Sequence, residues 1–291
     1  MPDSVARSGV TGVIHDIGYQ RYEGPRLGRG YASRSLFVHS VRGAYGLGRS
    51  AWAKVLPIGL LSLACIAALV LVVVNTQLPV QVIDYVGIGS TFTYAATVFV
   101  AVVAPELVSV DLRSNLLSLY LSRPLRRTDY ALTKLASLTA AAFVMLAAPM
   151  VILFLGMAFS TDDGIAGVLS EVGGLLEGFV VAAIHAAVLA ALALPFAALT
   201  GRRVFASGMI IGVFLLTAPV SGALLAFSSG DGAYLAGLIN PVNLLNGVDR
   251  WLFDGGTFDI GSYGPVYGLV SLAVFAVGTA CTVWRYRKVR S

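Results

Sequence analysis

The sequence predicts an all-α membrane protein with six transmembrane helices and both termini on the cytoplasmic side. Hydrophobic residues make up 57% of the 291 residues, charged residues make up only 12%, and the mean hydropathy is +0.82. These values are far from the balance of a soluble globular domain. The basic residues, in addition, lie almost entirely in alternate connections between the apolar runs. We therefore expect a multi-pass protein of a plasma or inner membrane.

Six runs with few or no charged residues are long enough to cross the hydrocarbon, which takes about 20 apolar residues in a helix. Backbone in lipid must satisfy its own hydrogen bonds, so these runs are predicted to be helices rather than strands. The predicted spans are about 55–74, 87–108, 131–159, 173–199, 205–227 and 263–284. They form one domain, 55–284, between a cytoplasmic leader at 1–54 and a cytoplasmic tail at 285–291.

The positions of Lys and Arg predict the orientation, because basic flanks are retained on the cytoplasmic side. Of the 20 basic residues, eight lie in the leader, five between spans two and three, two between spans four and five, and four in the tail. The other three connections hold Arg250 alone, together with eight acidic residues. With 19 basic residues on one side, an even number of spans is required. The pI of about 9.3 then reflects topology and contact with anionic membrane lipid, not nucleic-acid binding.

The leader contains a candidate helix that lies along the inner membrane interface. Between residues 33 and 54, apolar side chains recur every three to four residues, with Arg42 and Arg49 beside them. An interfacial elbow helix that turns into span one at Pro57 would explain this pattern. A solvated linker beside the membrane is the alternative. The 14–29 segment has no helical periodicity, and the sequence assigns it no role.

The connection between spans five and six, 228–262, is long and unusually apolar. It contains leucines, Trp251 and Phe253 among the turn-forming Asn-Pro and Asp-Gly-Gly sequences. A segment of this kind is too apolar for a plain loop and too broken to span the membrane. We expect one or two short helices at the outer interface.

The segment between spans two and three, 105–134, is the most informative part of the sequence. Its core, 112–121, has helical apolar spacing, and Pro124 would end the helix. A short cytoplasmic helix held between two spans can transmit motion into the membrane when a partner protein binds it.

This segment resembles the intracellular loop of ABC-2 type transporter permeases. The residues that carry the resemblance are Asp111-Leu112-Arg113, Asn115-Leu116-Leu117, Leu121-Ser122-Arg123-Pro124-Leu125, Arg126, Tyr130 and Lys134. One departure is Asn115, where the commoner family pattern has Gly. The six-span layout, the elbow helix and the helical outer segment are similar to that family as well. Of these features, only the sequence motif at 111–134 is specific to that family.

The resemblance implies ATP-driven export with the motor on a separate polypeptide. Two ABC ATP-binding subunits, which use ATP and Mg, and a second copy of this permease or a related one are the implied partners. The implied coupling residues are Glu106, Asp111, Arg113, Asn115, Leu116, Leu119, Tyr120, Arg123, Pro124 and Arg126. A lipophilic substrate would pass along the seam between two permeases. Candidate path residues are Phe92, Tyr94, Phe99, Phe214 and Thr217, with ordinary core packing as the alternative for each.

The sequence contains no machinery for ATP hydrolysis or metal chemistry. No G-x-x-x-x-G-K-[ST] phosphate-binding string occurs, and the nearest glycine-rich stretch, 43–50, ends GLGRS without the Lys. His185 has no His or carboxylate at i+3 or i+4, so a metal site is not expected. We expect its imidazole to be neutral and hydrogen-bonded to a neighbouring helix, with a proton relay as the alternative.

Two other classes of function stay open at this stage. An intramembrane enzyme needs paired catalytic groups at membrane depth, and the spans offer only His185 and Glu177, eight residues apart, without an evident nucleophile. A membrane anchor or sensor that transports nothing would fit the composition equally well.

Overall fold

The structure is a computed structural model that describes residues 24, 27–77, 83–113, 125–200, 202–255 and 259–288. Within these ranges all regular secondary structure is helical, with no strand. Six of the described helices are long and apolar enough to cross a membrane, which confirms the all-α class and the predicted number of spans. They are α2 (Ala51–Gln77), α3 (Tyr85–Arg113), α5 (Arg127–Ser160), α6 (Gly164–Leu199), α7 (Arg203–Phe227) and α10 (Gly264–Lys288).

Several of these helices run past the predicted ends of the spans. Helix α6 begins at Gly164 rather than near 173, and α3 continues through Pro105 to Arg113 rather than ending at 108. Hydropathy marks where the chain stops being apolar, whereas a helix can continue into the polar interface as long as its backbone bonds are satisfied. The apolar runs therefore locate the spans but not the helix ends.

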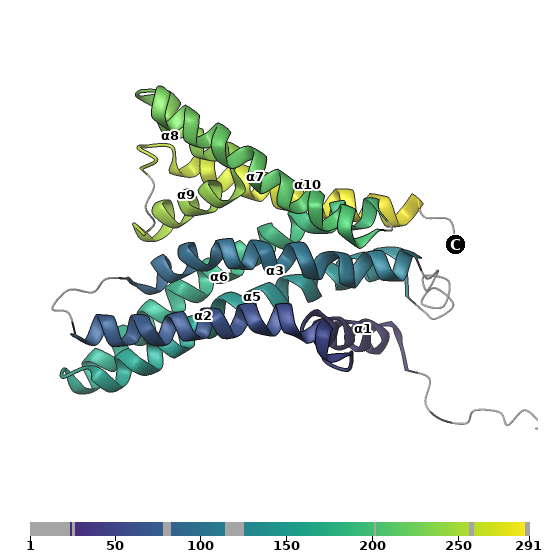
Figure 1. The fold of residues 1–291 in the computed structure, drawn as a ribbon, viewed down its shortest axis with the longest axis horizontal. Coiled ribbons are helices and arrows are strands. Elements are labelled where there is room, and N and C mark those ends of the chain that lie inside the picture. The colour runs from purple at the N-terminus through teal and green to yellow at the C-terminus, as the bar shows by residue number, and fades with distance from the viewer. Residues whose placement is uncertain are drawn as a thin grey trace, which may run out of the picture.

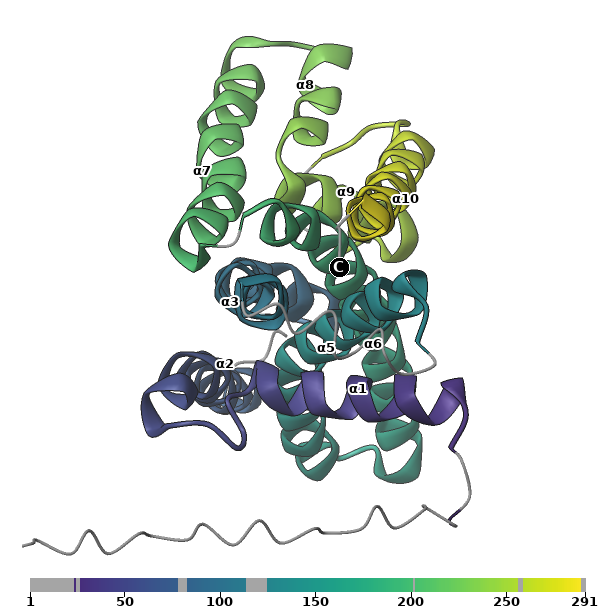
Figure 2. The same ribbon diagram turned by 90° about the vertical axis from the view of Figure 1, so that its right-hand side faces the viewer.

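Helices α5 and α6 form the centre of the bundle (Figures 1 and 2). Helix α5 packs against α1, α2, α3, α6 and α10, and α6 packs against α3, α5, α7 and α10. Small residues allow the close approach. At Gly278 in α10, a Cβ would lie only 2.1 Å from the carbonyl oxygen of Ala191 in α6, so any side chain at this position would separate the two helices.

The predicted helix of the leader is present but shorter than expected. Helix α1 (Arg29–Ala44) ends before Tyr45, and Pro57 lies inside α2 instead of at the turn. The turn comes earlier because Gly46 adopts a φ of 68°, and a Cβ there would lie 2.7 Å from the carbonyl oxygen of Ala53. Pro57 lies in the second turn of α2, so the backbone bond that its nitrogen would otherwise make to the carbonyl oxygen of Ala53 is missing.

The segment between α7 and α10 folds into short helices, as its turn signals predict. These are α8 (Asp231–Leu235), the 3₁₀ helix η1 (Ala236–Ile239) and α9 (Pro241–Phe253). The side chain of Asn240 caps α9 by accepting from the backbone N–H groups of Val242 and Asn243. One face of α9 is buried against α3, α6 and α10, so this helix belongs to the core of the bundle.

The segments predicted to be cytoplasmic gather at one end of the molecule (Figure 1). These segments are α1, the end of α3, the start of α5, the turn between α6 and α7, and the end of α10. Helix α1 lies across this end of the bundle (Figure 2). We call it the basic end, since it carries the described Arg and Lys residues other than Arg250.

Candidate functional site

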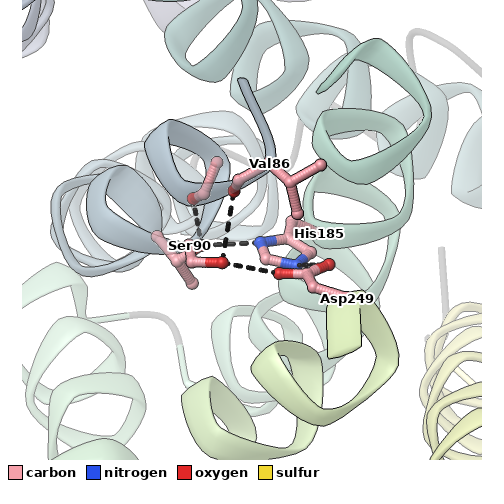
Figure 3. Close-up of polar contacts among 6 residues, drawn as sticks. Val86, Ser90, His185 and Asp249 are labelled. Atoms are coloured by element: carbon pink, nitrogen blue, oxygen red, sulfur yellow. Dashed lines mark hydrogen bonds and ion pairs between the residues drawn. The ribbon is translucent and has the colours of Figure 1, made fainter. Parts of the chain in front are cut away.

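A buried polar cluster joins three helices from distant parts of the chain (Figure 3). The imidazole Nε2 of His185 in α6 lies 3.0 Å from Oδ1 of Asp249 in α9, and its Nδ1 lies 2.6 Å from Oγ1 of Thr93 in α3. Ser90 in α3 donates its hydroxyl proton to Oδ2 of Asp249 at 2.8 Å. His185, Asp249 and Thr93 are fully buried, and Ser90 is 8% exposed. We call these four residues the His185 cluster.

Local helix geometry places each member of the cluster. Ser90 and Thr93 are three residues apart, so they lie on the same face of α3. The cap at Asn240 and the proline at the next position define where α9 begins. Nine residues after that cap, Asp249 lies on the buried face of α9 together with Leu245. The sequence features that start α9 thus aim its carboxylate into the bundle.

The single hydroxyl proton of Thr93 decides how the cluster is protonated. Its oxygen lies 2.8 Å from the carbonyl oxygen of Gly89 and 2.6 Å from His185 Nδ1, and one proton serves only one of them. If Thr93 donates to His185, the ring is neutral and donates from Nε2 to Asp249. If Thr93 donates to Gly89, its oxygen accepts from Nδ1 of the ring instead. Both arrangements pair every polar atom of the ring, as burial requires.

The cluster contains the residue types of a nucleophile, a base and an orienting acid, but its hydroxyl groups are not accessible to a substrate. Thr93 and His185 are 0% exposed, and the hydroxyl of Ser90 is bonded to Asp249. A catalytic nucleophile must reach a substrate carbonyl, and these hydroxyls lie in the packed interior. The geometry therefore favours a structural or conformational role over the intramembrane-enzyme alternative.

A second polar cluster lies at the basic end, around Glu106. Arg49, in the turn before α2, donates from Nη1 to Oε2 of Glu106 at 2.7 Å. Arg203, at the start of α7, forms an ion pair with the other carboxylate oxygen. The side chain of Glu106 is 12% exposed, while both arginines reach solvent. One carboxylate on α3 thus connects α3 to the beginning of two other spans. We call these three residues the Glu106 cluster.

The start of α5 is tied to the basic end in a similar way. Arg29, the first residue of α1, forms a two-point contact with the carboxylate of Asp129, with distances of 2.9 and 3.1 Å. Arg127 donates from Nη1 to the backbone oxygen of Arg287 in the last turn of α10. Leu125 is buried. The described residues on either side of 114–124 therefore contact α1, the turn before α2, α7 and α10.

The predicted coupling residues fall partly outside the described residues. Asn115, Leu116, Leu119, Tyr120, Arg123 and Pro124 lie outside the described residues. Asp111 and Arg113 lie in the last turn of α3. Arg126 is the N-cap residue of α5, and its backbone N–H donates to Asp129. Glu106 is the predicted coupling residue whose contacts are most fully described.

The candidate path residues do not gather on one surface of this chain. Phe92 and Phe99 are buried in the core, and Phe99 stacks against Tyr45 at a ring distance of 5.3 Å. Tyr94, in contrast, is 62% exposed on α3. Phe214 is half-buried on α7, and the hydroxyl oxygen of Thr217 accepts from Nδ2 of Asn240 at 3.1 Å. Core packing therefore accounts for Phe92 and Phe99, and helix pairing accounts for Thr217.

Sequence reasoning missed the partners of three residues. It assigned Asp249 to the outer connection, Arg49 to the flank of the interfacial helix and Arg203 to the topology signal. The signal for Asp249 was His185 itself, since an ionisable group inside a span requires a polar partner. Among the described residues no group of three or more His, Cys, Asp or Glu side chains could hold a metal ion.

No protein-family model matches this chain, and no curated protein matches it.

Proposed function

We propose that this chain is the transmembrane permease subunit of an ATP-driven ABC exporter of the ABC-2 type. Six candidate spans and 19 basic residues predicted on one side support a polytopic protein with cytoplasmic termini. The motif at 111–134 supports the family. The observation that carries the proposal is that described residues before and after 114–124, Glu106 on one side and Arg127 and Asp129 on the other, contact other helices of the bundle.

These contacts provide a route for mechanical coupling. A force on 111–134 passes through Glu106 to Arg49 and Arg203, which begin α2 and α7. It passes through Asp129 to Arg29 and hence to α1. Ion pairs of this exposure contribute little to stability, about 1 kcal/mol or less each. In this proposal the ion pairs act as mechanical links. They join α3 and α5 to the starts of α1, α2 and α7, so that these helices move together.

In the proposed mechanism, the transporter is closed while the short outer helices contact α6 and α7. Contacts at the outer end of the bundle hold it in that state. Asn240 bonds to Thr217, and Asn243 donates to the hydroxyl of Ser221 at 3.0 Å, so α9 is attached to α7. The pair between His185 and Asp249 attaches α9 to α6. Tilting of α7 relative to α6 strains these contacts first. Outward opening in this mechanism separates the short outer helices from one of the two spans.

The proposal specifies the partners. Two copies of an ABC ATP-binding subunit bind and hydrolyse ATP with Mg, and this chain binds neither. A second copy of this permease, or a related permease, completes the transporter in the plasma or inner membrane. The substrate is lipophilic, and it moves along the permease seam that includes the exposed Tyr94.

Transport by the reconstituted complex tests the proposal. The neighbouring open reading frames are searched for a P-loop ATPase, and the chain is co-expressed with it and reconstituted in proteoliposomes. Lipophilic drugs, lipids and peptides are expected to stimulate ATP hydrolysis and to accumulate across the membrane. ATP hydrolysis that no compound of this panel alters, together with an absence of ATP-dependent movement, would support the anchor or sensor alternative.

A further inference from the structure

A cavity of about 820 Å³ lies at the basic end, away from the His185 cluster. Its walls are α1, the turn that follows α1, and parts of α3 and α5. The α1 residues that line it include Tyr31, Ser35, Val38 and Arg42, which recur at three- to four-residue spacing and so share one helix face. The cavity therefore lies beside α1 at the ends of the spans. Helix α1 crosses this end of the bundle (Figure 2).

The lining of the cavity is strongly cationic. It contains Arg34, Arg42, Arg49 and Lys134 against a single carboxylate, Glu106. Glu106 is already engaged by Arg49 and by Arg203 from outside the cavity. No ion pair to a described residue engages the guanidinium of Arg34 or of Arg42. Two planar, five-donor groups therefore face the cavity without an anionic partner in the described part of the chain.

Buried polar groups lie next to the same cavity. Ser40 is 2% exposed, and its hydroxyl has no hydrogen-bond partner among the described residues. Lys134 is 4% exposed, with its ammonium nitrogen 5.4 Å from the centre of the Tyr130 ring. The Ser40 hydroxyl lies on the inward face of α1 with Leu36 and Ala44, closed off from the cavity. The charge that the interior adds to the cavity is therefore that of Lys134.

The surroundings indicate what kind of anion fits. Tyr31, Val38 and Leu47 line the cavity and are about half-exposed apolar groups, with exposed fractions of 58%, 46% and 47%. Trp52, in the first turn of α2, is 86% exposed, which is typical of an indole at the headgroup level of a membrane. A soluble anion would gain nothing from an apolar rim, whereas the glycerol and acyl portions of a lipid would.

We propose that this cavity binds the phosphate group of an anionic phospholipid from the inner leaflet. Arg34 and Arg42 donate to the phosphate oxygens, and Lys134 contributes positive charge from α5. The lipid chains leave past Val38 and Leu47 toward the hydrocarbon. The proposal requires a membrane-embedded bundle but does not depend on export.

The test measures binding of a fluorescently labelled phosphatidylglycerol to the full chain in detergent, by anisotropy, against a labelled phosphatidylcholine. We expect selective binding of phosphatidylglycerol. The double variant R34Q/R42Q is expected to weaken this binding roughly tenfold or more, since each basic group near a surface contributes comparably to anionic-lipid attraction. The matched control R287Q removes an exposed charge at the same end and is expected to leave the affinity within about twofold.

A second control variant alters α1 without altering the charge of the cavity. In S40A, loss of the inward-facing hydroxyl of α1 leaves the unfolding temperature unchanged or raises it, and binding of phosphatidylglycerol stays within about twofold of the wild type. Equal binding of both lipids, or unchanged binding by R34Q/R42Q, would overturn the proposal. Full displacement of the lipid by millimolar inorganic phosphate would overturn the lipid as the source of the phosphate. Export that persists in R34Q/R42Q leaves the proposed transport function intact.

Discussion

Nε2 of His185 lies 3.0 Å from Oδ1 of Asp249, and this contact joins the middle of α6 to a short helix 64 residues further along the chain. Both side chains are almost completely inaccessible, with exposed fractions of 0% and 1%. Burial of either group alone in an apolar bundle would be very unfavourable, so each makes the burial of the other possible. The contact therefore attaches α9 to α6, and the bond from Ser90 to the same carboxylate attaches α9 to α3.

The first prediction concerns the energetic coupling of this pair. Asp249→Ala leaves a buried imidazole without its main partner, and we expect the free energy of unfolding in detergent to fall by about 3–5 kcal/mol. The double variant His185→Phe/Asp249→Leu removes both polar groups, and we expect it to recover a large part of that loss. Asp254→Asn, an exposed residue at the end of α9, is the control and should stay within about 0.5 kcal/mol. If the double variant lost as much free energy of unfolding as the two single substitutions together, the result would contradict the pairing.

The second prediction concerns the Glu106 cluster. Glu106→Gln removes the charge that holds Arg49 and Arg203 but keeps the size of the side chain. We expect substrate-stimulated ATP hydrolysis in proteoliposomes to fall on the order of tenfold, because coupling energies between sites are of this size. Thermal stability should change little. Glu177→Gln, an exposed carboxylate on α6, is the matched control, and an equal loss of coupling in both variants would argue against a specific role for Glu106.

The third prediction uses charge exchange between Arg29 and Asp129. Asp129→Arg places two cations at the contact between α1 and α5, and we expect it to reduce transport. Arg29→Asp combined with Asp129→Arg restores an ion pair of opposite polarity and should recover most of the activity. The readout is ATP-dependent uptake into inverted vesicles. If the double variant is as inactive as Asp129→Arg alone, the contact does not act as a mechanical link.

The fourth prediction concerns pH. Burial raises the pKa of the Tyr45 phenol above its ordinary value of about 10, and the nearby thiol of Cys65 acts in the same direction. The phenol donates to the carbonyl oxygen of Ala141 at 2.8 Å. Because the folded pKa exceeds the unfolded one, this stabilisation is fully present below about pH 10 and is lost as the pH rises further.

Tyr45→Phe should therefore lower the free energy of unfolding by about 1 kcal/mol at neutral pH. Above pH 10 it should show a shallower decline than the wild type. Thermal unfolding in detergent between pH 7 and pH 11 measures both effects. Parallel curves for the two proteins would show that Tyr45 ionises as freely in the folded state as in the unfolded one.

The spans were predictable because the hydrocarbon imposes one demand on every segment that crosses it. Each crossing needs about 20 apolar residues with all backbone groups paired, and composition alone reveals such runs. Helix ends follow a weaker rule. Residues such as Gly164 and Arg113 extend helices into a region where polar and apolar side chains are both tolerated, so hydropathy gives no boundary there.

The His185 cluster could not be predicted from local sequence. Three aspartates, Asp249, Asp254 and Asp259, lie close together in the outer connection, and periodicity does not single out the one that faces inward. That choice depends on the packing of α9 against α3 and α6, which is a tertiary property. The same holds for Arg49 and Arg203, whose charge predicted sidedness but not the carboxylate that they share.

Dependence on a separate ATPase is tested most directly by the rate of ATP hydrolysis when the neighbouring P-loop ATPase is reconstituted with this chain. We predict that the wild-type chain assembles with the ATPase and changes its rate, and that Leu116→Asp and Leu119→Asp abolish both effects without loss of helical content. An ATPase rate that is the same with the wild-type chain, with either variant and with empty membranes would contradict the assignment as an ABC permease.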